Sequence, residues 1–126
     1  MIDKNIKIPY AEIDEDIVDL CKALNSIDGI QTLFSCSGHG KKDAYVSCMA
    51  KNAKTYNKFV YTTIYGSPFT VQFFMSQVMF TNYDLNRIYF NIKIPCVVIS
   101  KDNVTIDFSY IKLLTAKIKT LQSLFN

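Results

Sequence analysis

The chain has 126 residues, of which 49% are hydrophobic and 20% charged, and this balance predicts one compact domain, residues 1–126, rather than a disordered, fibrous or two-domain chain. Its longest stretch without a charged side chain, residues 59–83, is interrupted by polar residues, which excludes a transmembrane helix and a membrane partner. The net charge of +3 includes a single arginine, so we expect a small anionic ligand rather than a nucleic acid.

The first predicted helix begins at Asp14, which we expect to be its N-cap, and ends near residues 26–29. Glu15 and Asp16 follow in the first turn, where the helix dipole favours negative charge. This position explains the acidic cluster, and we do not count it as a site. The apolar residues recur at helical spacing and are Ile17, Leu20, Cys21, Leu24 and Ile27.

Two strands follow the first helix and are predicted to pair as a hairpin. In residues 30–36 apolar and polar side chains alternate, which puts Ile30, Phe34 and Cys36 on one expected face. Residues 44–50 alternate in the same way and return beside the first strand. The connecting residues 37–43 are the least usual segment, because they combine glycines, a histidine and lysines.

A second helix and two further strands are predicted in the middle of the chain. Asn52 is expected to cap the helix, and Gly66 and Pro68 end it. Residues 69–80, rich in aromatic and β-branched side chains, predict a long strand. Residues 88–94 alternate most clearly, with apolar side chains on one face. The other face is predicted to be polar and aromatic, with Arg87, Tyr89, Asn91 and Lys93.

The last part of the chain predicts a short strand at residues 96–99, a turn at residues 101–103 and a final helix capped by Asp107. Apolar residues cover more of this helix than one core-facing stripe, so it lies between two layers or packs against another subunit. The elements together predict an α+β fold, with about five mostly antiparallel strands and three helices in a single-layer sandwich domain.

The four cysteines are interpreted mainly as small core hydrophobes. The first ten residues do not have the features of a secretory signal, so we expect a cytoplasmic protein, in which disulfides are rare. Cys36 and His39 are also of the residue types that begin a zinc site, with Cys48 as a third ligand across the hairpin, or that form a nucleophile with its base. Neither a fourth ligand nor an orienting carboxylate is evident, so we predict no metal ion and no catalytic residue.

Residues 35–42 have the composition of a phosphate-binding loop. Glycines let backbone N–H groups approach an anion, hydroxyls donate to phosphate oxygens, and lysines add positive charge. The glycine spacing matches neither the P-loop nor the dinucleotide-binding fingerprint. The alternative is a solvated hairpin tip whose glycines serve only turn geometry. The candidate ligand contacts here are Ser35, Ser37, Gly38, His39, Gly40 and Lys41.

A second set of candidate contacts lies on the strand over residues 88–94. Arg87 offers a bidentate phosphate contact, Tyr89 a stacking ring, and Asn91 an amide for a base edge or a ribose. These residues share one predicted face because they are two residues apart. The alternative is the solvent-facing side of an antiparallel strand.

A helix start followed by a Ser-Cys-Ser-Gly strand end occupies residues 13–38. The residues that carry this pattern are Ile13, Asp14, Ile17, Val18, Leu20, Leu24, Asn25, Thr32, Ser35, Cys36, Ser37 and Gly38. The pattern resembles the amino-terminal segment of the tRNA methyltransferase family of wybutosine synthesis. This resemblance implies S-adenosylmethionine and tRNA as ligands, and methyl transfer is therefore the alternative function.

The chain as a whole is small and rich in Lys, Asn and Ile, and its Gly29-Ile30-x-Thr32 strand leads into a Ser-Cys-Ser-Gly-His-Gly loop ahead of a long final helix. These features resemble the phage and prophage anti-Thoeris proteins. The resemblance implies a sponge, a homo-oligomer that binds the cyclic ADP-ribose variants made by a bacterial TIR-domain immune enzyme. It also implies pockets near subunit interfaces and a ligand that is held rather than degraded.

We therefore expect a phage anti-defence protein that is not an enzyme and needs no cofactor. It sequesters a cyclic ADP-ribose-type nucleotide in the host cytoplasm as a homo-oligomer. A third hypothesis is a structural domain whose final helix docks another protein and which has no affinity for nucleotides.

Overall fold

The computed structural model describes residues 14–38, 42–73, 87–100 and 103–125. These residues form three α-helices and six strands, so the expected α+β fold class is confirmed, with one strand more than expected. The elements are a 3₁₀ turn (Glu15–Ile17), α1 (Val18–Asn25), β1 (Ile30–Cys36), β2 (Ala44–Ala50), α2 (Ala53–Phe59), a π-helical turn (Val60–Ile64), β3 (Thr70–Phe73), β4 (Ile88–Ile94), β5 (Val97–Ser100), β6 (Asn103–Ile106), α3 (Ser109–Leu121) and a 3₁₀ turn (Gln122–Leu124).

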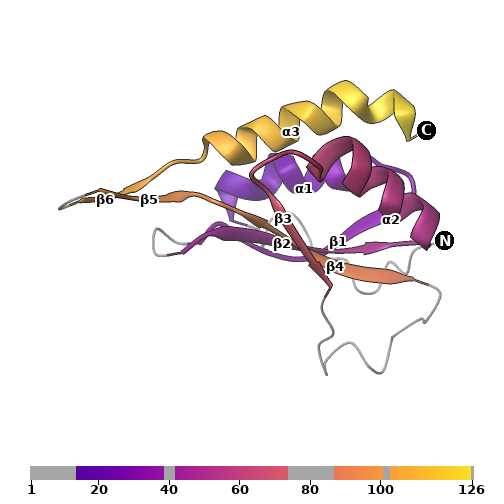
Figure 1. The fold of residues 1–126 in the computed structure, drawn as a ribbon, viewed down its shortest axis with the longest axis horizontal. Helices are drawn as coiled ribbons and strands as arrows, with labels where there is room; N and C mark the ends of the chain where they lie inside the picture. Colours follow the sequence, from indigo (N-terminus) through magenta and orange to yellow (C-terminus); the bar gives the residue numbers. More distant parts are fainter. Residues whose placement is uncertain (1–13, 39–41, 74–86, 101–102, 126) are drawn as a thin grey trace.

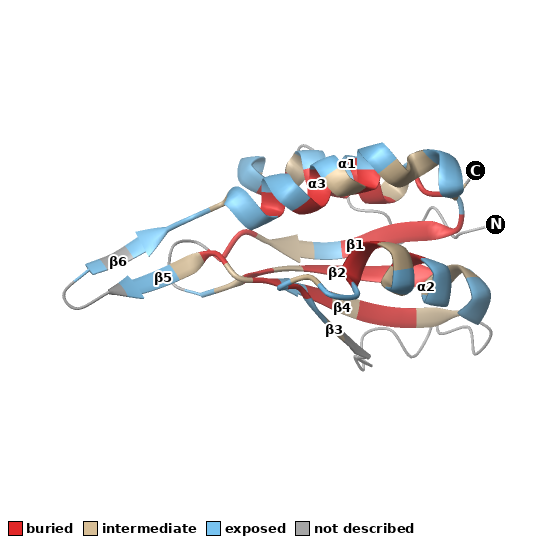
Figure 2. Ribbon diagram, turned by 45° about the horizontal axis from the view of Figure 1, so that its top comes forward, coloured by how far each residue is buried: buried red, intermediate tan, exposed pale blue. Residues whose placement is uncertain are grey.

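Four strands form one antiparallel sheet in the order β1-β2-β4-β3, and the three helices lie on one face of it (Figure 1). β5 and β6 form a separate antiparallel hairpin that projects beyond the body of the molecule (Figure 1). The backbone N–H of Asp107 donates to the carbonyl oxygen of Cys96 at 2.8 Å and closes the base of this hairpin. Figure 2 shows that the hairpin is largely exposed, whereas the centre of the sheet is buried.

The main core lies between the helices and the sheet. Phe90 of β4 is fully buried, and its ring packs edge-to-face on Tyr56 and against Phe59 of α2. α1 and α3 contribute Leu20, Leu24, Ile111, Leu114 and Ile118 to the same cluster. Aromatic pairs of this kind stabilise a core beyond their buried area, by about 0.5–1.5 kcal/mol each. The core therefore fixes the sheet that carries the candidate site.

A β-bulge in β1 overturns the expected facing of its last residues. Thr32 lies opposite Cys48, but Phe34 lies opposite Ser47, the next residue of β2, so Leu33 is an extra residue in β1. The alternation therefore shifts by one residue beyond Thr32. Phe34 is 42% exposed and Cys36 is half-buried, which corrects the expectation that both lie on the core face with Ile30.

The face of β4 expected to be polar is also largely inaccessible to solvent. Tyr89 is 4% exposed, and its partner across the strand pair, Met49, is fully buried. Leu33 is buried as well, although it does not belong to the cluster under the helices. Of the expected polar set, Arg87 and Asn91 are half-buried and Lys93 is exposed. The sheet thus buries side chains on both of its faces.

Other differences concern the ends of elements. β3 spans Thr70–Phe73, and the rest of the strand expected over residues 69–80 lies outside the described residues. Residues 101–103 were expected to form a turn that leads into the final helix, but Asn103–Ile106 form strand β6. Asp14 stands at the N-cap position of the first helical turn, but its side chain makes no capping hydrogen bond there. Within the described ranges, no helix combines the length and apolar character needed to span a membrane.

Candidate functional site

The end of β1 is anchored by an acidic side chain from the start of the first helical turn. Oδ2 of Asp14 accepts a hydrogen bond from the backbone N–H of Ser37 at 3.0 Å and one from its hydroxyl at 3.1 Å. Ser37 is 5% exposed. Hydrogen bonds to a carboxylate are stronger than those between neutral groups. The point where the chain leaves β1 is therefore fixed against the helical layer.

Gly38 follows in a conformation that favours glycine. Its φ is +89°, and a Cβ built on it would lie 2.0 Å from the carbonyl oxygen of Lys42. The backbone N–H of Lys42 donates to the carbonyl oxygen of Gly38 at 3.3 Å. Gly38 and Lys42 therefore bring the two ends of the connecting loop together, and a side chain at position 38 would disrupt this contact.

Cys96, between β4 and β5, holds the loop ends from another direction. Its Sγ lies 3.5 Å from the carbonyl oxygen of Ser37 and 3.4 Å from that of Lys42. Its backbone N–H donates to Oδ1 of Asp43 at 3.3 Å. Burial raises the pKa of the Cys96 thiol, and the negative charge of Asp43 raises it further, so the thiol keeps its proton and can donate it. The loop ends are thus joined to each other and contact two further parts of the chain, at Asp14 and at Cys96.

The predicted contacts at this end of the sheet have different environments. Ser37 and Gly38 belong to the anchored strand end, and His39, Gly40 and Lys41 lie outside the described residues. The bulge turns Ser35 toward the helices, where its hydroxyl forms a hydrogen bond with the thiol of Cys21. That hydrogen bond lowers the pKa of Cys21, but burial has the larger effect and the net direction is upward. The hydroxyls of Ser35 and Ser37 therefore both point toward the helical layer, where each already has a hydrogen-bond partner.

The contacts predicted on β4 lie on the sheet face away from the helices. Nη1 of Arg87 is 3.5 Å from Sδ of Met49, and Oδ1 of Asn91 accepts a hydrogen bond from the hydroxyl of Ser47 at 3.2 Å. Tyr89 is buried between them, so its ring is not offered for stacking at the surface. Arg87 and Asn91 thus both contact side chains of β2.

Arg87 and the anchored loop lie at opposite ends of the strand pair. Cys36 pairs with Tyr45 at the loop end of β2, whereas Ile88, next to Arg87, pairs with Ala50 at the other end. At about 3.4 Å per residue, this separation is roughly 20 Å. Within one chain, Arg87 and the loop ends therefore do not meet around one small ligand.

A groove of about 300 Å³ that the sequence reasoning did not identify lies at the far end of β2 from the loop. Three lysines line it, together with Asp28, Asn52, Thr55 and Phe125. These lysines, Lys51, Lys54 and Lys58, follow one another at three- and four-residue spacing. The four-residue spacing places Lys54 and Lys58 on one face of α2, while Lys51 lies just before the N-cap Asn52. This run of lysines is the sequence signal that could have revealed the groove.

A second hollow, of about 490 Å³, lies between the first helical turns and α3. Glu15, Asp16 and Asp19 line one side, and Lys112 and Lys119 line the other, with Phe108 and Ile111 between them. Acidic and basic groups are mixed in this hollow, whereas lysines predominate in the groove near α2. An anion is therefore attracted more strongly to the groove.

The cysteines are all free thiols, and Cys21, Cys48 and Cys96 are buried as expected. The zinc hypothesis combined Cys36 with Cys48. Cys36 pairs with Tyr45 and Cys48 pairs with Thr32, so the two cysteines lie on opposite sides of the bulge. The described part of the chain has no group of three or more His, Cys, Asp or Glu side chains placed to hold a metal ion. Burial raises the pKa of Cys48 well above its ordinary value, which keeps this thiol protonated.

Comparison with known proteins gives no relative: no family model, no curated protein sequence and no solved structure matches the chain. The arguments for a function therefore come from the residues and their geometry.

Proposed function

We propose that this chain is a phage anti-defence protein that binds a cyclic ADP-ribose-type nucleotide and sequesters it without degrading it, at the loop that follows β1. The observation that carries the proposal is the anchoring of this loop by Asp14, Gly38 and Cys96. Binding loops hold a ligand tightly when a rigid scaffold positions them, because less conformational entropy is lost on binding.

The composition of the loop suits the diphosphate of such a nucleotide. Between the anchored residues Gly38 and Lys42 the sequence has only His39, Gly40 and Lys41. Backbone N–H groups near glycine and the ammonium groups of two neighbouring lysines are the donors that phosphate oxygens accept. Lys42 itself is exposed and adds charge at the base of the loop. The proposed site therefore centres on residues 37–42, and Arg87 is not part of it within the same chain.

We also propose that the protein acts as a homo-oligomer, through the projecting hairpin of β5 and β6. Ile99 is 79% exposed and Ile106 is 50% exposed, and Leu113 of α3 is 52% exposed. Exposed aliphatic side chains on a projecting arm favour burial against another subunit. Ile99 and Thr105 allow a matched test. Thr105 pairs with Val98, the residue before Ile99, so the side chains of Ile99 and Thr105 lie on opposite faces of the hairpin.

The oligomer is tested by light scattering coupled to size-exclusion chromatography. Ile99→Asp should lower the molar mass toward that of one chain, while Thr105→Asp on the opposite face of the hairpin should leave it unchanged. A wild-type protein that elutes as a monomer contradicts this part of the proposal.

Ligand sequestration is tested by mass spectrometry. Purified protein is incubated with cyclic ADP-ribose isomers and, separately, with S-adenosylmethionine; free ligand is removed, the protein is denatured, and the released compound is identified. Recovery of an intact cyclic nucleotide supports the proposal. Recovery of a cleaved nucleotide, of S-adenosylmethionine or of nothing contradicts it, and S-adenosylmethionine would favour the methyltransferase alternative.

Two variants locate the site if the nucleotide is recovered. Lys42→Glu reverses a charge at the loop base and should weaken binding about tenfold or more, because a charge-assisted hydrogen bond contributes about 1.5–3 kcal/mol. Lys119→Glu makes the same charge change on α3 and serves as the control. Equal weakening by both variants would mean that net charge, and not the loop, determines affinity.

A further inference from the structure

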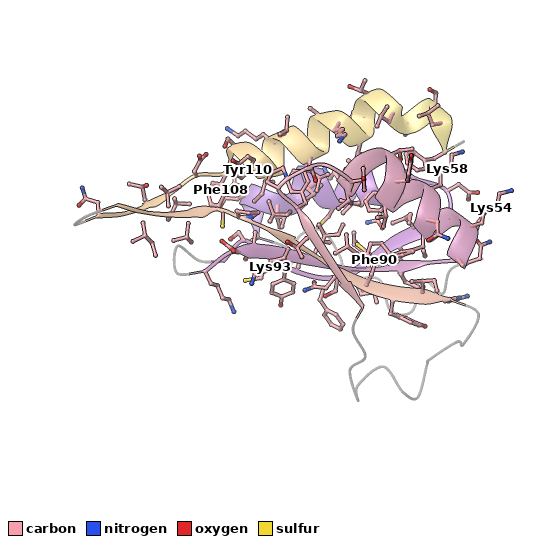
Figure 3. All side chains as sticks on the ribbon, in the orientation of Figure 1. Lys54, Lys58, Phe90, Lys93, Phe108 and Tyr110 are labelled. Carbon is pink, nitrogen blue, oxygen red and sulfur yellow. The ribbon has the colours of Figure 1, made fainter. Side chains whose placement is uncertain are left out.

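The lysine groove near α2 combines positive charge, a defined hollow and an aromatic wall. Figure 3 shows Lys54 and Lys58 together on α2, at the opposite end of the sheet from Lys93. The groove volume of about 300 Å³ lies at the lower end of the range for small-molecule sites. It is therefore large enough for one compact ligand and too small for a folded nucleic acid.

Lys51 is held in place by its surroundings. Its ammonium group pairs with Oδ2 of Asp28 at 2.9 Å, and its backbone N–H donates to the carbonyl oxygen of Gly29 at 2.8 Å. The aliphatic part of the Lys51 side chain lies across Gly29, where a Cβ would come within 2.7 Å of it. Gly29, whose φ is +86°, thus leaves the space in which the lysine side chain lies.

Lys54 and Lys58 lie one helical turn apart on α2 and repel each other. Among the described residues, the groove has one acidic side chain, Asp28, and that carboxylate already pairs with Lys51. The Lys58 ammonium instead lies 5.8 Å from the ring centre of Phe125, a cation–π contact. An anion bound between the two lysines relieves their repulsion and supplies the charge that the groove lacks.

Phe125 forms the aromatic wall of the groove. Its ring is half-buried and packs against Phe59 of the core at a centroid distance of 6.4 Å, so its position is fixed. A planar base attached to the bound phosphate can contact this ring as the Lys58 ammonium shifts to the phosphate.

We propose that the lysine groove is a binding site for a nucleoside phosphate, with Lys54 and Lys58 on the phosphate and Phe125 beside the base. The site is independent of the loop after β1, because the two lie at opposite ends of β2. It goes beyond the proposed function, since it requires neither a cyclic nucleotide nor an oligomer.

The test is calorimetric titration of the full chain with pyrophosphate, ADP and adenosine at low and at high salt. We expect pyrophosphate and ADP to bind, ADP more tightly, and adenosine to show no binding, with affinities that fall as salt rises. Equal affinity for pyrophosphate and ADP would overturn the role of Phe125. Absence of binding by both phosphates would overturn the site.

Charge variants assign the binding to the groove. Lys54→Glu combined with Lys58→Glu should weaken ADP binding by about tenfold or more, since charged hydrogen bonds are lost. Lys117→Glu combined with Lys119→Glu changes the net charge of the chain by the same amount on α3 and should have less than about a twofold effect. Equal loss in both double variants would overturn the site in favour of non-specific attraction.

A third variant is expected to strengthen binding, which is a result that unfolding of the variant could not produce. Asp28→Asn removes the carboxylate that pairs with Lys51. Because the Asp28 side chain is exposed, the substitution should cost little stability, and it should tighten ADP binding several-fold. Unchanged or weaker binding would contradict the placement of an anion in this groove, because the Asp28 carboxylate lines the groove and repels a bound phosphate. Lys42→Glu, by contrast, should leave ADP binding in the groove unchanged while it weakens the cyclic nucleotide, so the two proposals can fail separately.

Discussion

Asp14 and Ser37, which are 23 residues apart in the sequence, are joined by two hydrogen bonds to a single carboxylate oxygen. One comes from the backbone and one from the side chain of Ser37, so the carboxylate orients both. The contact ties the first helical turn to the residue that follows β1, where the candidate loop begins.

Asp14→Ala should destabilise the protein by about 1–3 kcal/mol, because the buried N–H of Ser37 loses its acceptor. Ser37→Ala removes only the hydroxyl bond and should cost about 1 kcal/mol. Urea denaturation measures both changes, with Asp19→Ala on the exposed side of α1 as the control. A cost for Asp14→Ala no larger than that of the control would contradict the anchoring role.

Gly38 and Gly66 both have positive φ values, +89° and +78°, but different surroundings. Gly38→Ala should cost about 3 kcal/mol or more, because backbone strain adds to the overlap with the Lys42 carbonyl. Gly66→Ala should cost only about 1–2 kcal/mol, since no atom lies within 4 Å of the new methyl group and strain alone remains. Denaturant midpoints compare the two variants, and equal costs would show that the contact with Lys42 is unimportant.

The thiols should differ in their reactivity. Burial raises the pKa of Cys21, Cys48 and Cys96, so these thiols have little thiolate at neutral pH, and each is shielded from reagent. Cys36 is half-buried, and we expect iodoacetamide to modify it first in the native protein. Intact-protein mass spectrometry follows the reaction, and Cys36→Ala should remove the fast phase. Rapid labelling of a second thiol in that variant would contradict the buried placement of the others.

Asp107 should make stability depend on pH in the acidic range. The backbone N–H of Ser109 donates to its Oδ1 at 2.9 Å, and this bond, with the Ser109 side chain and Lys112, lowers the pKa of Asp107 below its ordinary value of 3.8. Because the folded-state pKa is the lower one, the stabilisation is present above the ordinary pKa and is lost as pH falls through the folded-state value. Asp107→Asn should reduce the acid-dependent loss of unfolding free energy, measured by denaturation at several pH values, with Asp19→Asn as the control. An unchanged pH profile would show that the carboxylate is not coupled to folding.

Several elements were predictable because their side-chain patterns are local. The strands Ala44–Ala50 and Ile88–Ile94 match the alternation in the sequence, and Ile30–Cys36 has the expected bounds although its alternation shifts at the bulge. Asn52 caps α2 as expected, and its side chain accepts a hydrogen bond from the backbone N–H of Thr55 at 2.8 Å. Asp107 was expected to be the N-cap of α3, but the helix begins at Ser109 and Phe108 is at the N-cap. The Asp107 carboxylate, one residue before the N-cap, accepts a hydrogen bond from the backbone N–H of Ser109.

The candidate site was less predictable, because alternation cannot reveal an insertion within a strand. The extra residue Leu33 turns Ser35 toward Cys21 and moves Cys36 off the core face. The two-residue spacing placed Tyr89 on the face of β4 that was expected to be polar, yet Tyr89 is buried. Burial depends on what covers a face of the sheet, and the sequence of the strand does not show this. Lys51, Lys54 and Lys58 showed helical spacing, but nothing local connected them to Asp28 or Phe125.

The sequence by itself determined the fold class and the positions of the main strands and helices. These features follow from local periodicity, capping residues and glycine conformations, which need no knowledge of distant contacts. Only the tertiary structure decided that Asp14 holds Ser37, that Arg87 lies about 20 Å from the loop, and that three lysines meet Phe125 in one groove. These contacts join residues that are far apart in the chain. They depend on strand register and on helix packing, and the same local patterns are compatible with many registers and packings, of which the folded protein adopts one.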